Sequence, residues 1–322
     1  MSGTGKNKRG AAGGTCGGGS AAKKSRARST KEQAALDEQL LEASSGGHTE
    51  TMEALLAEGA DKEAKNDDGN TALILASDTG HTETVQVLLA AGADKDAKNK
   101  YGSTALIRAS SGGHTETVQA LLAAGADKDA KNKYGNTALI LASNRGHTET
   151  AQALLVAGAD KDAKADNGAT ALMLASCHGH TEIAQALLAA GADKETKDNG
   201  GRTALIFASD MGHAEIAQSL LAAGADKEAK SNDGDTALIL ASQEGRTEIV
   251  ALLKASIPVI LCVPAAEAPL HSLPSGGASQ AAAAAAYAAD VPPHALAPPG
   301  PGRGDAGGGS SSSSSSSSED DE

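Results

Sequence analysis

Histidine and cysteine side chains are the first candidates for metal-binding or nucleophilic chemistry in this sequence. A Gly-His pair recurs at a constant interval, and its histidines are His48, His81, His114, His147, His180 and His213. Equivalent residues of successive repeats lie about one repeat spacing apart, far beyond the ~2.0–2.1 Å at which zinc binds an imidazole nitrogen. Cys177, His178 and His180 form the one local cluster of soft ligands, and no second pair follows at zinc-finger spacing. We therefore expect the repeated histidines to hydrogen-bond backbone between repeats, and we expect no metal site.

Three other patterns match ligand-binding or catalytic motifs only in part. The Asp94-x-Asp96 and Asp127-x-Asp129 pairs lack the glycine and the glutamate that a calcium loop needs at its sixth and twelfth positions. Residues 3–6 read Gly-Thr-Gly-Lys, which is not the spacing of a phosphate-binding loop. Every candidate member of a Ser/His/Asp or Cys/His arrangement is a residue of the repeat consensus. The sequence therefore predicts a protein that is not an enzyme and needs no cofactor.

Composition limits the fold and the location of the protein. The 322 residues carry a net charge of −13, and only four of them are aromatic, so we expect an aliphatic core. No stretch approaches the ~20 apolar residues of a membrane span, and the N-terminus has no hydrophobic signal segment. Three cysteines far apart in the sequence do not describe a disulfide framework. We expect a soluble, monomeric, intracellular protein, cytoplasmic or nuclear, that does not contact membranes.

The elements that position these side chains recur with the same interval as the histidines. Thr-Ala-Leu begins at residues 71, 104, 137, 170, 203 and 236, and Gly-Ala-Asp-Lys begins at 59, 92, 125, 158, 191 and 224. In the unit 66–98, Thr71 is a good N-cap for a short apolar helix that Gly80 ends. A second helix starts near residue 81, places its apolar stripe at positions 85, 88 and 89, and stops at Gly92. An extended, hairpin-like connection leads to the next unit.

A single unit cannot be stable alone. Each predicted helix has about ten residues, below the ~12–15 at which isolated helices become even marginal in water. Stacking units at an axial spacing of roughly 8–10 Å buries the Leu and Ala stripe of each unit against the next. We therefore predict an all-α solenoid of about seven stacked helix pairs.

The pattern Asp/Asn-x-x-Gly-x-Thr-x-Leu-x-x-Ala, followed by Gly-His, Leu-Leu and Gly-Ala-Asp, resembles the ankyrin repeat over residues 33–256. The unit 99–131 has Ala105 and Ile107 where the family's Thr-Pro-Leu-His has proline and histidine, so a preorganised first helical residue is missing. The resemblance implies an ankyrin-type solenoid with a protein-binding role. Its predicted units are an N-terminal cap unit at 33–65, five full units at 66–98, 99–131, 132–164, 165–197 and 198–230, and a truncated unit at 231–256.

The segments outside the repeats have the composition of disordered chain. Residues 1–32 are Gly-rich, with eight basic residues and one acid. Residues 257–322 are rich in Pro, Ala, Gly and Ser and end in four acids. Before the first unit, Ser29 and Glu32 offer a capping box. After the last unit, the apolar run 259–263 is either a plug over the last exposed stripe or an adhesive linker.

A partner-binding surface should use the positions at which the repeats differ, because the shared positions serve the fold. These are the second, third and fifth residues of each unit, at the hairpin tip, and the pair before the mid-unit glycine. The ankyrin resemblance places them on the concave side, and tyrosine is enriched at interface hot spots. The predicted contact residues are Lys100, Tyr101, Ser103, Lys133, Tyr134, Asn136 and Arg145. The alternative is recent duplication of one unit, with tips that bind nothing.

Arg108 occupies a position that holds Leu or Phe in the other units. We expect its guanidinium to reach solvent along its aliphatic stem, with a contact role on the concave face as the alternative. Neither interpretation gives it a partner inside the fold.

The arms carry motifs of another kind. Two basic clusters suit nuclear import or weak attraction to phosphate backbones, and their residues are Lys6, Lys8, Arg9, Lys23, Lys24, Arg26 and Arg28. A solvated basic arm is the alternative. Ser316, Ser317 and Ser318 each have an acid three residues on, as acidophilic kinases favour. The tail is therefore a phosphorylation candidate, with an unmodified linker as the alternative.

These observations favour a non-catalytic protein-interaction module. It would act as an adaptor, scaffold or inhibitor that binds an unidentified protein through its hairpin tips and concave helix face. This hypothesis has no nucleic-acid partner. One alternative is a nuclear regulator whose basic N-terminal arm contacts nucleic acid while the repeats bind a co-regulator. Another is a spacer without a specific partner.

Overall fold

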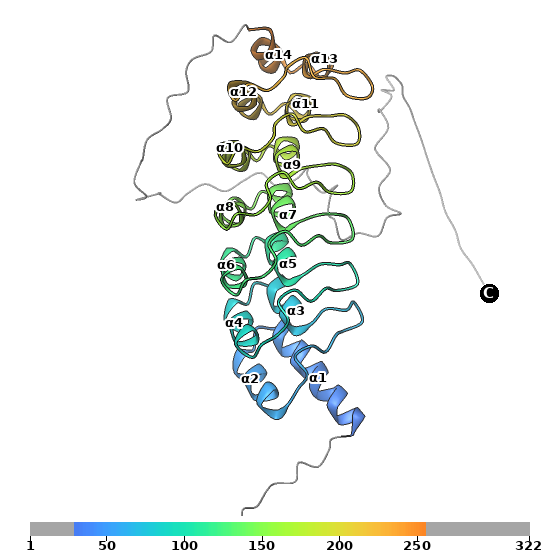
Figure 1. Cartoon of the computed structure of the whole chain (residues 1–322), viewed down its shortest axis with the longest axis vertical. Helices are drawn as coiled ribbons and strands as arrows, with labels where there is room; N and C mark the ends of the chain where they lie inside the picture. Colours follow the sequence, from blue (N-terminus) through green and yellow to red (C-terminus); the bar gives the residue numbers. More distant parts are fainter. Residues whose placement is uncertain (1–28, 256–322) are drawn as a thin grey trace, which may run out of the picture. The chain divides into compact units, whose positions relative to one another are not determined.

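The structure, a computed structural model, describes residues 29–255. This part of the chain is all-helical, without a strand, and its fourteen helices form seven pairs, as predicted (Figure 1). The pairs are α1 (Thr30–Ser45) with α2 (Thr49–Glu58), α3 (Ala72–Asp78) with α4 (Thr82–Ala90), α5 (Ala105–Gly112) with α6 (Thr115–Ala123), α7 (Ala138–Arg145) with α8 (Thr148–Val156), α9 (Ala171–His178) with α10 (Thr181–Ala189), α11 (Ala204–Met211) with α12 (Ala214–Ala222), and α13 (Ala237–Gln243) with α14 (Thr247–Lys254).

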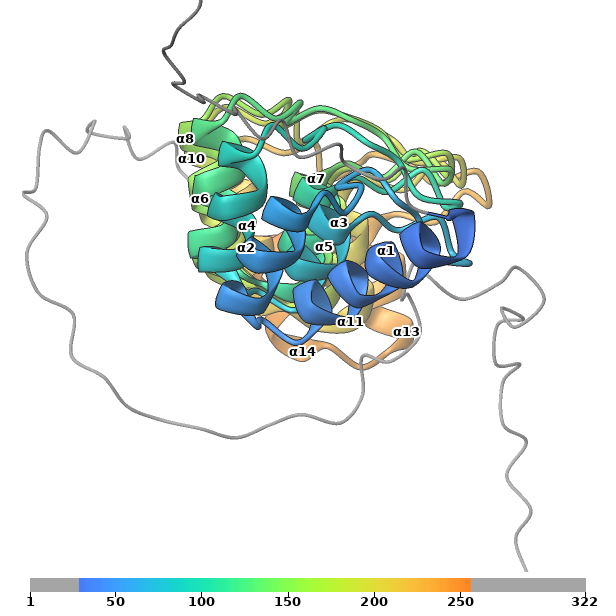
Figure 2. The ribbon, with the colours of Figure 1, turned by 90° about the horizontal axis from the view of Figure 1, so that it is seen from below.

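The helices of the stack form two layers. Each odd-numbered helix packs against the next odd-numbered helix, and each even-numbered helix against the next even-numbered one. The hairpin loops project from the side of the odd-numbered helices, and the loops of successive repeats lie above one another (Figures 1 and 2). We therefore call the odd-numbered helices inner helices and the even-numbered ones outer helices.

The same local signals set the helix bounds in each repeat. In the repeat 99–131, the Thr104 hydroxyl accepts a hydrogen bond from the Ile107 N–H at 3.4 Å and starts α5. Gly113 ends this helix at a φ of +74°, a conformation that L side chains rarely adopt. A Cβ atom at Gly113 would also lie 2.5 Å from Nδ1 of His147 in the next repeat. The Gly-His pair is thus a contact between repeats as well as a helix end.

The core is an aliphatic layer between successive repeats. Leu106 and Ile107 of α5, and Val118 and Leu121 of α6, are at most 1% exposed. Burial of such a side chain stabilises the fold by about 1.5–3 kcal/mol. Because the helices after α1 have only seven to ten residues, this burial between neighbours is what makes them stable.

The two ends of the stack differ. Ser29 and Glu32 form the predicted capping box, in which Glu32 N donates to Ser29 Oγ at 3.3 Å and Ser29 N to Glu32 Oε2 at 2.9 Å. Helix α1 therefore begins at Thr30, so the first repeat includes the last three residues of the segment predicted as an arm. At the other end Ile239 is 41% exposed, whereas its internal counterpart Ile107 is 1% exposed. The apolar run 259–263 lies outside the described residues.

Candidate functional site

The hairpin tips form one hydrogen-bonded row along the stack. The Lys133 N–H donates to the Tyr101 carbonyl at 2.9 Å, and equivalent bonds join successive tips from residue 68 to residue 232. Within a tip, Asn99 Oδ1 accepts hydrogen bonds from Tyr101 N and Ser103 N, each at 2.9 Å. The backbone of the tips is therefore committed to the fold, while the side chains at the second and third positions of the repeats 99–131 and 132–164 are not.

Four of the seven predicted contact residues lie on this row of tips with accessible side chains. Lys100 and Lys133 are exposed, Tyr101 is 38% exposed, and Tyr134 is partly exposed. Neither tyrosine hydroxyl has a hydrogen-bond partner among residues 29–255. Both rings can therefore present an apolar body and a donor to a partner.

Two of the predicted contact residues are buried, so the prediction that they contact a partner was wrong. Ser103 is 1% exposed and Asn136 is 9% exposed, and their N–H groups donate to the side chains of Asn99 and Asn132. The fifth position of the tip turns back toward the inner helix, so its side chain is covered. Variation at this position therefore does not indicate partner contact in these two repeats.

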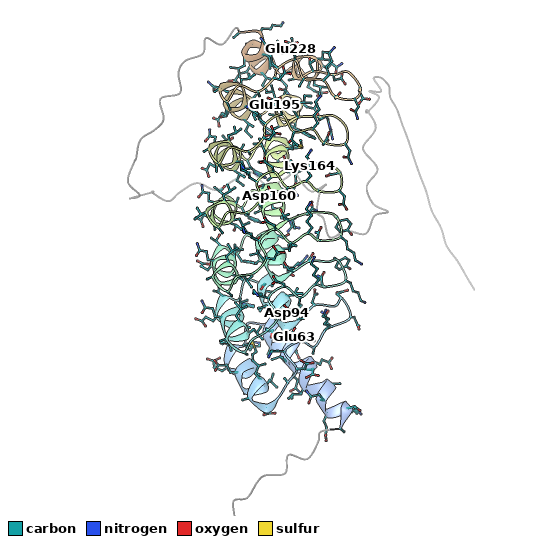
Figure 3. All side chains as sticks on the ribbon, in the orientation of Figure 1. Glu63, Asp94, Asp160, Lys164, Glu195 and Glu228 are labelled. Atoms are coloured by element: carbon teal, nitrogen blue, oxygen red, sulfur yellow. The ribbon has the colours of Figure 1, made fainter. Side chains whose placement is uncertain are left out.

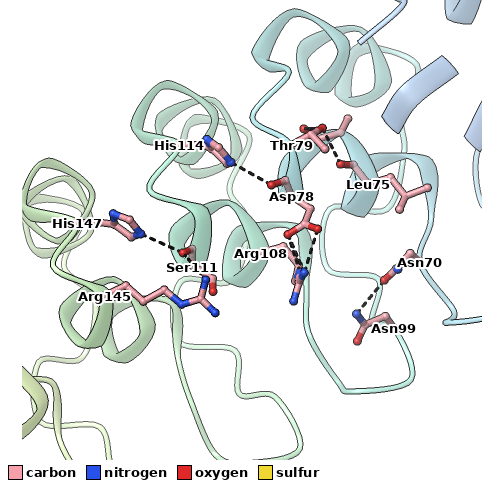
Figure 4. Close-up of polar contacts among 11 residues, drawn as sticks. Asn70, Leu75, Asp78, Thr79, Asn99, Arg108, Ser111, His114, Arg145 and His147 are labelled. Carbon is pink, nitrogen blue, oxygen red and sulfur yellow. Dashed lines mark hydrogen bonds and ion pairs between the residues drawn. The ribbon is translucent and has the colours of Figure 1, made fainter. Parts of the chain in front are cut away.

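The prediction for Arg108 was wrong, because its guanidinium has a partner inside the fold. Nε and Nη2 donate to Oδ1 and Oδ2 of Asp78, each at 2.9 Å, which is a bidentate pair (Figure 4). Asp78 ends the inner helix α3 of the preceding repeat. Both side chains are partly exposed, so the pair contributes modestly to stability and mainly fixes the direction of both groups.

Arg145, the last residue of the inner helix α7, lies near this pair. Its Nη1 donates to the Ser111 carbonyl at 3.1 Å, and no carboxylate of the described residues forms an ion pair with it (Figure 4). Burial is the main cause that lowers the pKa of Arg145, and the neighbouring Arg108 charge lowers it further, against a smaller effect of Asp78. We call Lys100, Tyr101, Lys133, Tyr134 and Arg145 the central patch.

The prediction that the repeated histidines hydrogen-bond backbone between repeats is confirmed for His81, His114, His147, His180 and His213. His147 Nε2 donates to the Ser111 carbonyl at 3.0 Å, and His114 Nε2 donates to the Asp78 carbonyl at 3.0 Å (Figure 4). Burial lowers the pKa of His147, and it does the same at His180 and His213. These side chains join repeats and are not available as ligands.

The histidines of the local Cys-His cluster also form contacts within the fold. The Cys177 carbonyl accepts from His213 Nε2 at 3.1 Å, and His178 Nδ1 donates to the Leu174 carbonyl at 2.9 Å. The rings of His178 and His180 stack, with centroids 6.0 Å apart. Among residues 29–255, no group of three or more His, Cys, Asp or Glu side chains is arranged to hold a metal ion.

The Gly-Ala-Asp-Lys loops contain a ladder that sequence reasoning missed. Asp127 N donates to Asp96 Oδ1 at 2.8 Å, and Asp160 N donates to Asp129 Oδ1 at 2.7 Å. Acids of these loops recur along the stack, as the labels of Figure 3 show. Each of these carboxylates accepts a hydrogen bond from an N–H group 31 residues later, in the next repeat. Acids that recur with this separation were the signal in the sequence.

One further arginine has a place that the sequence did not indicate. Arg202 lies over the ring of Phe207, 4.2 Å from its centroid, and donates to Asp198 Oδ2 from Nε at 3.2 Å and from Nη2 at 3.1 Å. All three residues belong to the repeat 198–230. The arginine is thus held within its own repeat.

The predictions for the two arms are not tested by the structure. The basic cluster residues Lys6 to Arg28 and the serines Ser316, Ser317 and Ser318 lie outside the described residues. Their roles in nuclear import and phosphorylation stay predictions. None of the helices between residues 29 and 255 has the length and apolar character needed to cross a membrane.

Paired short helices, a row of linked tips and contacts repeated from unit to unit define a helical repeat protein. A family model described as ankyrin repeats (3 copies) matches residues 40–132, 113–198, 137–231 and 195–259. The chain therefore belongs to the ankyrin repeat family. Comparison with curated proteins finds no match. Ankyrin repeats are generally protein–protein interaction modules and are generally non-catalytic.

Proposed function

We propose that this chain is a non-catalytic adaptor, scaffold or inhibitor that binds a partner protein through the central patch. The observation that carries the proposal is the tip ladder, in which the Lys133 N–H bonds to the Tyr101 carbonyl at 2.9 Å. Because backbone atoms and Asn side chains hold the tips, the adjacent Lys-Tyr pairs can meet a partner without a change of fold. Little conformational entropy is then lost on binding.

The residues of the central patch suit such an interface. Tyrosine and arginine dominate binding hot spots, and Tyr101, Tyr134 and Arg145 lie in two adjacent repeats. The lysines Lys100 and Lys133 can tune encounter and specificity at the rim. The rest of the stack, whose tips differ in charge, serves as the rigid support of this surface.

A capture experiment with a matched control tests the proposal. Immobilised full-length chain is compared with Tyr101→Ala/Tyr134→Ala and with Asp233→Ala, which changes the same tip position in a distant repeat. Proteins retained from a cell extract are identified by quantitative mass spectrometry. We expect a partner that the tyrosine variant loses and that the chain with the distant change Asp233→Ala retains. Equal retention by all three chains would contradict the proposal and favour a spacer without a specific partner at this surface.

A further inference from the structure

The variable positions of the stack divide by charge. In the repeats 99–131 and 132–164, the tip positions and the exposed positions of the inner helix carry four cations and no acid, namely Lys100, Arg108, Lys133 and Arg145. The equivalent positions of the preceding repeat carry Asp67, Asp68 and Asp78, and the following repeat carries Asp166. A cationic zone two repeats long is therefore bordered by acids, in a chain whose net charge is −13.

Three of these four cations have no carboxylate partner. Arg108 is neutralised by its bidentate pair with Asp78. Lys100, Lys133 and Arg145 form no ion pair with any carboxylate of residues 29–255. An exposed guanidinium without a carboxylate counterion, held in place by the Ser111 carbonyl, is a preorganised site for an anion.

Three loop lysines of the same two repeats serve as a comparison for the cations of the central patch. Lys128 lies 3.8 Å from Asp129 and Lys161 lies 3.3 Å from Asp162, both on the loop ladder. Lys131 Nζ donates to the Lys164 carbonyl at 2.8 Å. These three loop lysines have partners within the fold, whereas Lys100 and Lys133 form no ion pair with any carboxylate of residues 29–255.

We propose that the central patch binds a short acidic segment of a partner protein. The proposal rests on the proposed function and names the chemistry of the partner. At a repeat spacing of roughly 8–10 Å and about 3.3 Å per extended residue, the two tips and their margins cover roughly six residues. Lys100 and Lys133 receive carboxylates of the segment and the tyrosine hydroxyls donate to it, while Arg145, at the far end of the eight-residue helix α7, attracts it at longer range.

The bordering acids set the length of that segment. Asp67, Asp68 and Asp166 repel carboxylates that extend beyond the two repeats, so the acidic stretch is confined to the zone. A nucleic acid carries phosphates at regular spacing along its whole length, and the same acids repel it. The favoured partner is thus a protein with a local acidic cluster.

Binding of defined peptides by the full-length chain tests this proposal. Fluorescence anisotropy measures the affinity for labelled hexaglutamate, hexalysine and a single-stranded oligonucleotide at low and physiological salt. The patch variants are Lys100→Glu/Lys133→Glu and Arg145→Gln. The matched control is Lys164→Glu/Lys230→Glu, which makes the same change in net charge at exposed loop positions.

We expect hexaglutamate to bind, more weakly as salt rises, and hexalysine not to bind to the patch. The Lys100→Glu/Lys133→Glu variant should lose about tenfold in affinity and Arg145→Gln about threefold or more, while the control stays within about twofold. Equal losses in the patch variant and the control, no binding of hexaglutamate, or tighter binding of the oligonucleotide would overturn the proposal. A chain truncated to residues 1–309 that binds hexaglutamate tenfold more tightly would also overturn it, because its own acidic tail would then be the occupant. If partner capture depended on Tyr101 and Tyr134 but the chain did not bind hexaglutamate, the acidic-segment inference would be refuted and the proposed function would stand.

Discussion

A row of buried serine hydroxyls offers a direct test of the packing between inner helices. Each serine occupies the same position near the end of an inner helix, is at most about 1% exposed, and has a hydroxyl without a hydrogen-bond partner in the described part. These residues are Ser77, Ser110, Ser143, Ser176 and Ser209. We predict that Ser143→Ala stabilises the protein.

The magnitude follows from two effects with the same sign. Leaving a buried hydroxyl unpaired costs about 1–3 kcal/mol, and alanine is a better helix former than serine by up to about 0.7 kcal/mol. Loss of the oxygen's few packing contacts, at about 0.1–0.2 kcal/mol each, offsets part of the gain. The free energy of unfolding should therefore rise by about 1–2 kcal/mol.

Two serines at the same repeat position provide matched controls. Ser44 is fully buried, but its Oγ donates to the Leu40 carbonyl at 2.7 Å, and the exposed Ser242 donates to the Leu238 carbonyl at 2.7 Å. Ser44→Ala loses a satisfied bond, so it should be neutral or cost up to about 1 kcal/mol, and Ser242→Ala should stay within about 0.5 kcal/mol.

Urea unfolding followed by circular dichroism measures all three variants. The midpoint of Ser143→Ala should rise while the m-value stays unchanged. If Ser143→Ala lowered the midpoint as much as Ser44→Ala does, the hydroxyl would be satisfied in the folded protein. The reasoning from its unpaired state would then be refuted.

Three further predictions follow from contacts between repeats. Gly113→Ala should cost about 2–3 kcal/mol in the same unfolding assay, because it strains a φ of +74° and displaces the His147 ring; a loss below about 1 kcal/mol would contradict this. The pKa values of His147, His180 and His213 are lowered in the folded protein, so the unfolded chain binds more protons between the folded-state and unfolded-state pKa values. The free energy of unfolding should therefore fall as the pH drops below about 6.5, and it should level off below the folded-state pKa. Replacing the three histidines with glutamine should flatten this dependence of the urea midpoint between pH 7.5 and 5.5, and an unchanged slope would exclude them as its source. Ile239→Ala should lower the free energy of unfolding by less than about 1.5 kcal/mol, whereas the same change at a fully buried isoleucine costs about 2–5 kcal/mol. A cost in the higher range would show that another part of the chain covers Ile239.

The candidate site was predictable from the sequence only for residues whose side chains are exposed at the tips and do not pack between repeats. Lys100 and Tyr101 were expected at an exposed tip because they vary at a position that the repeats do not share, and the structure places them there. Ser103 varies as well, yet it is buried, since variation between repeats does not report the direction of a side chain. Arg108 could not be assigned its partner, because Asp78 lies 30 residues earlier and meets it only after two repeats have stacked.

The sequence by itself determined the repeat length, the helix bounds, the aliphatic core and the capping box. These depend on local chemistry, such as Thr104 at a helix start and Gly113 at a helix end, copied at a constant interval along the chain. Tertiary structure alone decided which charges are paired and which loop acids serve the fold. Those properties arise at the interface between repeats, where a side chain meets atoms of the neighbouring unit, and no local pattern contains contacts between positions so far apart in the sequence.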